Sequence, residues 1–566
     1  MTMTGSRILV ECLIEQGVDT VFGYPGGSVL NIYDELGKNA HRLRHILTAH
    51  EQGAAHAADG WARSTGRPGV VIATSGPGAT NLVTGLATAY MDSSPVVAFT
   101  GNVPQSLLGR DSFQEVDISG ITMPITKHNF IVKDVAALAE TIRTAFAIAV
   151  SGRPGPVLVD ITKDVTAAGA EWSPDTPEAA ARRRLDTGKP ARPTEGGLER
   201  AAALLASARR PVLYAGGGII QAGAADALLA LAERLNAPVA LSFMGHGAFP
   251  SRHPLCTGMV GMHGSRASNM AFNEADLVIA AGARFSDRVV GDPGRFAREV
   301  SVLHLDIDPA EINKNVKTSL SLVGDVGESL RALAPLVERR ARNEWNVRVE
   351  EWKKERKPAR SFDRRGLEPR LVIEELHARA GDGAFVTTEV GQHQMWTAQY
   401  WPFTRPRSFV SSGGLGTMGF GTGAAMGVQA AHPEATVVHI AGDGSFRMNC
   451  AELGTISAYG LPIIIVVMNN GTLGMVRQWQ TMFYGKRHVQ TTLDRPPDFV
   501  KLAEAFGVEA WRAKDEAGLR SALDAAFARR APALIEVPID IDEAVLPMVP
   551  SGRPLSEQIL ETSAEA

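Results

Sequence analysis

Short runs of apolar residues recur along the chain, and each run ends abruptly in glycine, aspartate, asparagine or proline. Hydrophobicity within these runs is continuous rather than alternating, which is typical of parallel strands that helices bury on both faces. The predicted strands lie at 70–78, 96–104, 157–161, 212–218, 277–285, 302–309, 437–444 and 463–470. Helical patterns rich in alanine and leucine lie between them, for example at 198–210 and 227–236. This alternation of strand and helix predicts an α/β fold.

Two stretches of different composition interrupt the alternation. Residues 166–197 are rich in proline, alanine, glycine and charge, and we expect a linker there. Residues 338–366 are heavily charged and are expected to form a solvated helix followed by a connector, because a charge run is usually a wet surface. The three predicted domains, each a doubly wound α/β unit with a mainly parallel sheet, span 1–165, 190–335 and 366–545, followed by a tail at 546–566.

Composition narrows the classes of function. At 566 residues the chain is too long for a single hydrophobic core. A formal net charge of −4 disfavours nucleic acid or an acidic membrane surface as a partner. No apolar run approaches the roughly 18–20 residues that span a bilayer, and no secretory signal is visible. The dispersed cysteines Cys12, Cys256 and Cys450 favour a reducing compartment, so a cytoplasmic location is expected.

The segment AGDGSF places Asp443 between two glycines, directly after a predicted strand. Asn470 follows the next predicted strand, so both side chains are expected at the carboxyl ends of neighbouring strands. Carboxylate and amide oxygens suit Mg²⁺ or Ca²⁺. The backbone N–H groups of Gly442, Gly444 and Ser445 suit a diphosphate. The alternative is a plain strand-to-helix turn in which Asp443 caps the helix.

Two segments together resemble thiamine-diphosphate enzymes. GDGSFRMN followed by VVMNN resembles their diphosphate-binding motif, which begins with Gly-Asp-Gly and ends with Asn-Asn. The resemblance implies that Asp443, Asn470 and the backbone carbonyl of Thr472 hold Mg²⁺. TAHEQGAAHAADGWARSTGRPG resembles their catalytic-glutamate segment, which implies that Glu51 is the proton relay to the cofactor. From the residues alone, complementation of a helix dipole by Glu51 stays an alternative.

Further segments, in order from about residue 5 to 550, are similar to the catalytic subunits of the acetohydroxyacid synthase (acetolactate synthase) family. They include VFGYPGGSVLNIYDEL, FQEVDISGIT, GARFSDRV and GTLGMVRQWQ. The resemblance implies decarboxylation of pyruvate on thiamine diphosphate and ligation of the hydroxyethyl unit to a second pyruvate or to 2-oxobutyrate, in branched-chain amino-acid biosynthesis. It also implies a homodimer or homotetramer in which Glu51 meets cofactor bound on another subunit. A small regulatory subunit stays open.

The resemblance also implies individual contacts. Contacts to thiamine diphosphate are expected from Gly391, Gln392, His393, Gly416, Met418, Gly442, Gly444 and Ser445. A structural FAD is expected at Gly216, Gly217, Gly218, Met262, His263, Gly264, Arg284, Asp306 and Asp325. Contacts to the 2-oxo acids are expected from Gly27, Gln114, Lys127, Arg288 and Trp479, with Gln114 and Lys127 acting beside Glu51 in catalysis.

Purely structural roles are alternatives for several of these residues. Met418 and Trp479 could be ordinary core side chains, and Arg288 could pair with Asp287 or Asp292 on the surface. Ser28, Ser112 and Ser286 depart from the family's pattern, which leaves fine specificity and inhibitor sensitivity open.

Other functions stay open too. Within the superfamily they are pyruvate oxidase, glyoxylate carboligase and an FAD-free catabolic acetolactate synthase; outside it they are a non-catalytic homologue and a nicotinamide dehydrogenase. Glu51 disfavours glyoxylate carboligase, in which a valine takes its place, and the segments GMHG and GARF disfavour the FAD-free enzyme. The joint presence of Glu51, Asp443 and Asn470 disfavours a non-catalytic homologue. AGGG lacks the third glycine of a G-x-G-x-x-G fingerprint, which disfavours the dehydrogenase.

Overall fold

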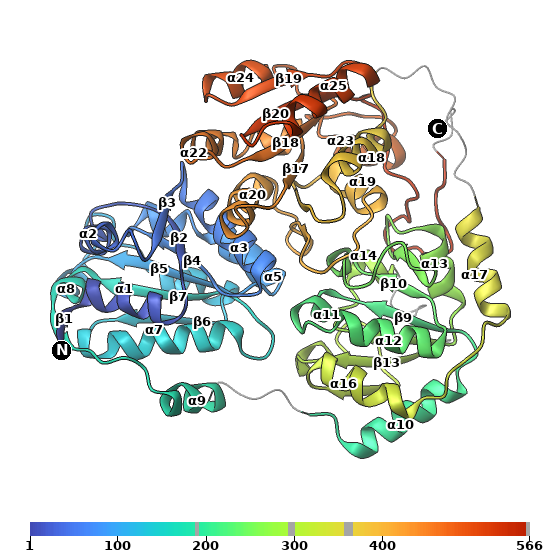
Figure 1. Ribbon diagram of the computed structural model, residues 1–566, viewed down its shortest axis with the longest axis horizontal. Coiled ribbons are helices and arrows are strands. Elements are labelled where there is room, and N and C mark those ends of the chain that lie inside the picture. Colours follow the sequence, from blue (N-terminus) through green and yellow to red (C-terminus); the bar gives the residue numbers. More distant parts are fainter. Residues whose placement is uncertain (187–191, 292–299, 356–365, 562–566) are drawn as a thin grey trace.

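A computed structural model describes residues 1–186, 192–291, 300–355 and 366–561. Its three six-stranded sheets contain only parallel pairs and are formed by consecutive stretches of the chain (Figure 1). Every strand predicted from the apolar runs lies in one of these sheets. The predicted α/β class with mainly parallel sheets is therefore confirmed. The predicted domain start at 190 and the last five residues of the predicted tail lie outside the described residues.

The N-terminal sheet has the strand order β3-β2-β4-β5-β7-β6. Its strands are β2 (Thr20–Tyr24), β3 (Arg44–Leu47), β4 (Gly69–Ala73), β5 (Val96–Asn102), β6 (His128–Val132) and β7 (Val157–Thr162). Alternate residues of β4 serve opposite faces: Val70 and Ile72 pack in one cluster, Val71 and Ala73 in another. Helices α1 (Gly5–Glu15), α2 (Leu30–Lys38) and α7 (Val135–Val150) cover the first face, and α3 (Glu51–Thr65) and α5 (Val83–Met91) cover the second.

The middle sheet has the order β11-β10-β9-β12-β13-β14. Its strands are β9 (Pro211–Ala215), β10 (Val239–Leu241), β11 (Cys256–Met259), β12 (Leu277–Ala281), β13 (Ser301–Asp306) and β14 (Leu320–Val323). One face is covered by α10 (Glu195–Ser207), α12 (Ala225–Leu235) and α16 (Val326–Leu333), and the other by α13 (Arg266–Glu274) and α17 (Glu344–Lys354). The short α11 (Gly217–Gln221) follows β9.

The C-terminal sheet has the order β16-β15-β17-β18-β20-β19. Its strands are β15 (Phe385–Thr388), β16 (Phe409–Val410), β17 (Val437–Gly442), β18 (Ile463–Asn469), β19 (Glu509–Arg512) and β20 (Ala533–Pro538). The covering helices are α18 (Pro369–Ala380), α19 (Gln392–Tyr400) and α25 (Glu516–Phe527) on one face, and α20 (Phe420–Ala431), α22 (Leu453–Ala458) and α24 (Phe499–Ala505) on the other. At the carboxyl edge lie α21 (Asp443–Phe446) and α23 (Gly474–Phe483).

Helices α3 and α20 join the first and third domains (Figure 1). Small residues on both helices let the backbones approach closely. A Cβ on Gly60 would lie 2.3 Å from the carbonyl oxygen of Ala424, and one on Gly427 would lie 1.8 Å from that of Ala57. Any larger side chain at these two glycines would force the helices apart. The two domains consequently share one hydrophobic core cluster.

Two predictions about the connecting segments need correction. The expected linker at 166–197 contains α9 (Pro177–Asp186) and a strand, β8 (Gly169–Glu171), that pairs antiparallel with β1 (Thr2–Thr4). Its residues 187–191 lie outside the described residues. The expected solvated helix exists as α17, but the face with Trp345 and Trp352 is buried against the middle domain. Mostly polar and charged residues separate the two tryptophans in the sequence. Their spacing of seven positions nevertheless places both on one face of the helix.

Across the described ranges, none of the helices combines the length and the apolar character that a bilayer-spanning helix needs.

Candidate active site

The centre of the candidate site lies at the carboxyl edge of the C-terminal sheet. Strand β17 ends at Gly442, directly before Asp443, and its neighbour β18 ends directly before Asn470. The strands pair in parallel with Gly442 opposite Met468, so Asp443 and Asn470 extend from the same edge. Both residues line one cavity of about 1690 Å³, as does Thr472. The structure therefore brings the three expected metal ligands together.

Asp443 has the features of a cation ligand. It is 2% exposed, and its Oδ2 has no hydrogen-bond partner among the described residues. Burial raises its pKa to about 6, although backbone hydrogen bonds and the charge of Arg447 act in the opposite direction. Asn470 is held in place by accepting a hydrogen bond from the Thr472 backbone N–H (3.2 Å) and donating one to Gln392 Oε1 (3.2 Å). A buried carboxylate beside an oriented amide fits a hard divalent cation.

The segment Gly391–His393 lies beside these residues, at the start of α19, and lines the same cavity. The Gln392 amide donates to Gln478 Oε1 (3.0 Å) and to the Glu543 carbonyl (2.7 Å), which fixes its orientation. Burial lowers the pKa of His393 to about 3, so its ring is neutral near pH 7, and its Nε2 has no partner among the described residues. Gly442, Gly444 and Ser445 line the cavity from the opposite segment. We use the name diphosphate half-site for nine residues: Gly391, Gln392, His393, Gly442, Asp443, Gly444, Ser445, Asn470 and Thr472.

Gly416 and Met418 also line the cavity, on the segment between β16 and α20. Gly416 has φ of 70°, a left-handed conformation that favours glycine, and nothing lies within 4 Å of a Cβ built on it. Glycine is therefore favoured at position 416 by the backbone conformation rather than by crowding.

The cavity continues to the middle domain, where all but one of the expected FAD contacts line it. The exception is Gly264, whose N–H donates to the Gly261 carbonyl in a tight turn. A Cβ on Gly216 would lie 1.9 Å from the Gly282 carbonyl oxygen, so this glycine is needed for chain packing whatever the ligand. Asp306 accepts from the Asp308 N–H (2.9 Å). The remaining expected residues on the cavity wall are Gly217, Gly218, Met262, His263, Arg284 and Asp325.

A second group gathers at the carboxyl ends of β2 and β4. Glu51 is the first residue of α3 and is 9% exposed; its Oε2 accepts from Asn81 Nδ2 (2.9 Å). A Cβ on Gly78 would lie 3.2 Å from Glu51 Oε1, and one on Gly76 would lie 2.8 Å from Gln114 Cα. The next residue after Gly27, Ser28, shares a hydroxyl hydrogen bond with Thr74 (2.9 Å). Glu51, Gln114 and Gly27 thus surround the segment 74–78, and we call them the glutamate half-site.

The two half-sites do not share the large cavity within one chain. Among the described residues, those lining the large cavity include the diphosphate half-site but not Glu51, Gln114 or Gly27. Within one chain, the expected proton relay therefore does not line the cavity that contains the diphosphate half-site.

Lys127 lies with neither half-site. Its Nζ donates to the carbonyls of Ile148 and Ser151 (2.6 Å each) at the carboxyl end of α7. Burial lowers its pKa to about 8. The favourable end of the helix dipole and two carbonyl acceptors hold this amine at α7.

Arg288 and Trp479 meet at the wall of the cavity. The Arg288 guanidinium carbon lies 5.7 Å from the centroid of the Trp479 ring, a cation–π arrangement. The side chain of Arg288 is 56% exposed and its Nε is 3.6 Å from Asp287 Oδ2, too exposed and too long for a strong ion pair. Trp479 Nε1 has no hydrogen-bond partner among the described residues. A planar cation beside an apolar wall fits a small organic anion.

Sequence reasoning missed a buried carboxylate in the diphosphate half-site. Glu389 is fully buried and accepts hydrogen bonds from Ser445 Oγ (2.8 Å), the Gly419 N–H (2.7 Å) and the Thr422 N–H (3.1 Å). Burial raises its pKa to about 6. The Ser445 hydroxyl is therefore engaged inside the protein, leaving its backbone for a ligand. The signal was present in FVTTEV, an acid at the carboxyl end of an apolar strand.

Sequence reasoning also missed two residues that hold Glu51. Asn81 bonds its carboxylate, as described above. Glu452, from the C-terminal domain, accepts from the backbone N–H groups of Ala49 and His50 (3.1 Å each), directly before the start of α3. No local pattern predicts this contact, because Glu452 and His50 lie 402 positions apart.

Comparison with known families agrees with this geometry. Three descriptions of thiamine pyrophosphate enzymes match consecutive stretches of the chain. The N-terminal TPP binding domain matches residues 3–121, the central domain matches 198–333, and the C-terminal TPP binding domain matches 389–537.

Similar proteins are found over almost the whole length. A probable acetolactate synthase large subunit of Methanocaldococcus jannaschii is 48% identical, over 97% of this chain and 94% of its own length. An acetolactate synthase of Arthrospira platensis is 46% identical, over 98% of both chains. The acetolactate synthase isozyme 3 large subunit of Escherichia coli is 43% identical, over 99% of this chain and 98% of its own. The chain therefore belongs to the thiamine pyrophosphate enzymes, and within them to the family of acetolactate synthase large subunits, which are thiamine-diphosphate-dependent carboligases.

Proposed function

We propose that this chain forms 2-acetolactate from two molecules of pyruvate, and 2-aceto-2-hydroxybutyrate from pyruvate and 2-oxobutyrate. In the first reaction two pyruvate anions and one proton give one 2-acetolactate anion and CO₂, with no net redox change. These products are early intermediates of branched-chain amino-acid biosynthesis. The observation that supports the proposal most is a single cavity lined by Asp443, Asn470, Arg288 and Trp479, in which Oδ2 of Asp443 has no hydrogen-bond partner among the described residues.

The residues of the chain have separate roles in this proposal. Bound thiamine diphosphate supplies a carbon nucleophile and an electron sink for decarboxylation. Asp443, Asn470 and the Thr472 carbonyl would hold Mg²⁺, which neutralises diphosphate charge. Glu51 holds and moves a proton at its carboxylate, oriented by Asn81. Of the expected substrate residues, Arg288 would bind a 2-oxo acid carboxylate through its planar fork.

FAD is part of the proposal as a structural cofactor, because the reaction has no redox step. The middle-domain wall of the cavity supports it: the turn at Gly216–Gly218 and the two carboxylates Asp306 and Asp325 face one continuous space. The volume of about 1690 Å³ exceeds the ~300–1,000 Å³ of an ordinary ligand pocket and leaves room for two cofactors.

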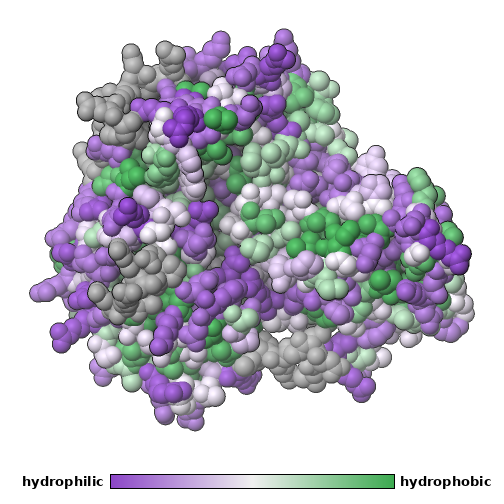
Figure 2. Space-filling view, turned by 180° about the vertical axis from the view of Figure 1, so that it is seen from behind, coloured by the Kyte–Doolittle hydropathy of each residue, from purple (hydrophilic) through white to green (hydrophobic). Residues whose placement is uncertain are grey.

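We further propose a homodimer or homotetramer in which Glu51 of one subunit reaches the diphosphate half-site of another. The separation of the two half-sites in one chain supports this arrangement. Phe113, next to Gln114 of the glutamate half-site, is 88% exposed, and Met123 of the same domain is 70% exposed. Contact with a second subunit would bury such apolar side chains. Figure 2 shows a hydrophobic band on the back of the molecule, on the side where the N-terminal domain lies.

Two finer expectations belong to the proposal. The similar proteins include chains named large subunits, so a small subunit is a candidate partner. Copurification of this chain with a coexpressed small subunit from the same organism would test that. A cytoplasmic location stays a prediction from the dispersed cysteines.

The proposal is tested by assaying the purified protein with pyruvate, with and without 2-oxobutyrate. Thiamine diphosphate, Mg²⁺ and FAD are each supplied or omitted, and products and redox change are measured. We expect acetohydroxy acids that require thiamine diphosphate and Mg²⁺, with no oxidant consumed. Oxidation of pyruvate at the expense of FAD would instead indicate a pyruvate oxidase.

Trp479→Leu should lower the preference for 2-oxobutyrate over pyruvate as acceptor. Loss of the aromatic wall removes apolar contact with the longer acceptor, and a change of this size is worth about tenfold in discrimination. The measurement is the product ratio when both acceptors compete. The matched control is Trp511→Leu, which removes a partly buried ring on β19 of the same domain, outside the cavity wall. An unchanged ratio in Trp479→Leu would remove this residue from acceptor choice.

A further inference from the structure

The segment Ser411–Met418 has no helix or strand of its own, yet it bears two of the expected cofactor contacts, Gly416 and Met418. It connects β16 to α20 and lies at the edge of the large cavity. A segment without backbone ladder bonds depends on side chains for its shape. We call it the cofactor loop.

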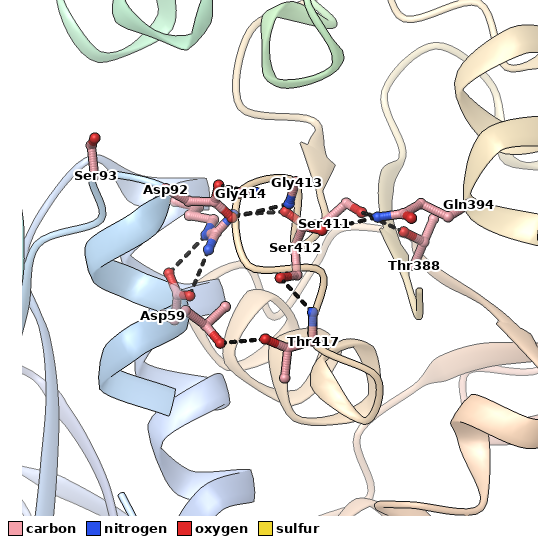
Figure 3. Close-up of polar contacts among 12 residues, drawn as sticks. Asp59, Asp92, Ser93, Thr388, Gln394, Ser411, Ser412, Gly413, Gly414 and Thr417 are labelled. Carbon is pink, nitrogen blue, oxygen red and sulfur yellow. Dashed lines mark hydrogen bonds and ion pairs between the residues drawn. The ribbon is translucent and has the colours of Figure 1, made fainter. Parts of the chain in front are cut away.

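Part of the support comes from the loop's own domain (Figure 3). The Ser411 hydroxyl lies 2.7 Å from the Thr388 hydroxyl and accepts from Gln394 Nε2 (2.8 Å). Within the loop, the Thr417 N–H donates to Ser412 Oγ (3.0 Å). These bonds fix the two ends of the loop but leave Gly413 and Gly414 between them.

The N-terminal domain of the same chain holds the middle of the loop. Asp92, at the end of α5, accepts from the backbone N–H of Gly414 at Oδ1 (2.7 Å) and from that of Gly413 at Oδ2 (3.1 Å), as Figure 3 shows. From the same helix, the Thr88 hydroxyl lies 2.7 Å from the Thr417 hydroxyl. One carboxylate thus binds two successive loop N–H groups.

Asp92 is itself fixed by a buried ion cluster. Arg63 Nη1 donates to Asp92 Oδ2 (3.0 Å) and to the Ser411 carbonyl (2.7 Å). Its Nε and Nη2 form a fork with the two oxygens of Asp59 (2.7 Å each). The side chains of Asp59 and Asp92 are fully buried and that of Arg63 is 7% exposed. Two carboxylates against one guanidinium leave an excess negative charge, which the loop N–H groups stabilise.

We propose that Asp92, held by Arg63 and Asp59, is a positioning residue that sets the shape of the cofactor loop and so determines how tightly thiamine diphosphate binds. This inference rests on the proposed function, which puts the cofactor beside Gly416 and Met418. Asp92 does not act on the substrate. It acts through the backbone of the loop.

Helix α3 then has two roles. Its first residue, Glu51, serves the diphosphate half-site of another subunit, while Asp59 and Arg63 hold the cofactor loop of their own. At 1.5 Å per residue, Glu51 and Arg63 lie ~18 Å apart along the helix. Each active site therefore depends on two N-terminal domains, and α3 is the rigid element between neighbouring sites.

Asp92→Asn tests the inference in the full-length protein with FAD and Mg²⁺ present. The asparagine keeps one acceptor oxygen but turns an NH₂ group toward the donors of Arg63 and the loop, so at least one charge-assisted bond is lost. We expect the Kd for thiamine diphosphate, measured by equilibrium dialysis, to rise at least about tenfold. At saturating cofactor, kcat and the KM for pyruvate should stay within about threefold of wild type, because no group on the substrate is changed.

The matched control is Glu15→Gln, which breaks a mostly buried ion pair with Arg143 (2.8 Å) in the same domain, away from the loop. It should lower the thermal unfolding temperature and leave the Kd unchanged. Thr88→Val is a milder probe: it removes one neutral bond to the loop and should raise the Kd about threefold. An unchanged Kd in folded Asp92→Asn or Thr88→Val, with wild type forming acetolactate, would overturn the inference and leave the proposed function intact. Wild type that binds no thiamine diphosphate would overturn the proposed function itself.

Discussion

Glu51→Gln should lower the rate of acetolactate formation by about 10²–10⁴-fold while thiamine diphosphate still binds. Glutamine matches glutamate in size and can still accept from Asn81, so the start of α3 should keep its structure. It has no carboxyl proton to give or take, and the proposed relay is lost. The measurement pairs turnover of pyruvate with equilibrium dialysis of the cofactor.

A suitable control is Glu11→Gln, which breaks the partly exposed ion pair between Glu11 and Arg42 in the same domain. Turnover by this variant should equal that of wild type. Near-normal turnover by Glu51→Gln would reject the proton-relay role, and loss of cofactor binding would show that Glu51 is needed to hold the cofactor.

Asp443→Ala should abolish the Mg²⁺-dependent retention of thiamine diphosphate. Asp443 is the only charged member of the expected ligand set, and its buried Oδ2 has no other partner among the described residues. Loss of groups that merely support a metal ligand weakens metal binding 10–100-fold, so removal of the charged ligand should cost at least about 100-fold. Dialysis of the loaded protein against buffer with and without Mg²⁺ measures the effect.

Asp498→Ala is the matched control, because it removes a carboxylate of the same domain that caps α24 at the surface. Its retention of cofactor should follow that of wild type in both buffers. If Asp443→Ala kept its cofactor in the presence of Mg²⁺ as wild type does, Asp443 could not be the metal ligand.

The apolar runs predicted the sheets well, since a strand buried on both faces needs continuous hydrophobicity wherever it lies in the fold. The same rule missed β8, a three-residue strand that is mostly exposed, and α9 within the expected linker. Short or exposed elements have no such hydrophobic signature. Their structure depends on contacts such as the Arg183–Glu140 ion pair (2.6 Å), which spans 43 positions.

The sequence predicted the site residues at the strand ends, but not the residues that hold them in place. Asp443 and Asn470 follow neighbouring parallel strands, so their proximity follows from strand order and register. The residues that hold the site in shape are different: Arg63 and Ser411 lie 348 positions apart and meet only because α3 packs on α20. The surroundings of Lys127 had no local signal either, because its amine is bound by carbonyls at the far end of α7, 21 and 24 positions along the chain.

In the proposed assembly, one active site combines Glu51 of one subunit with Asp443 of another. Coexpression of Glu51→Gln and Asp443→Ala chains, each inactive alone, tests it most directly through the rate of acetolactate formation. In a mixed dimer one of the two sites pairs an intact Glu51 with an intact Asp443, so random assembly should restore about a quarter of the wild-type rate. A mixture no more active than the separate variants would contradict a site shared between subunits.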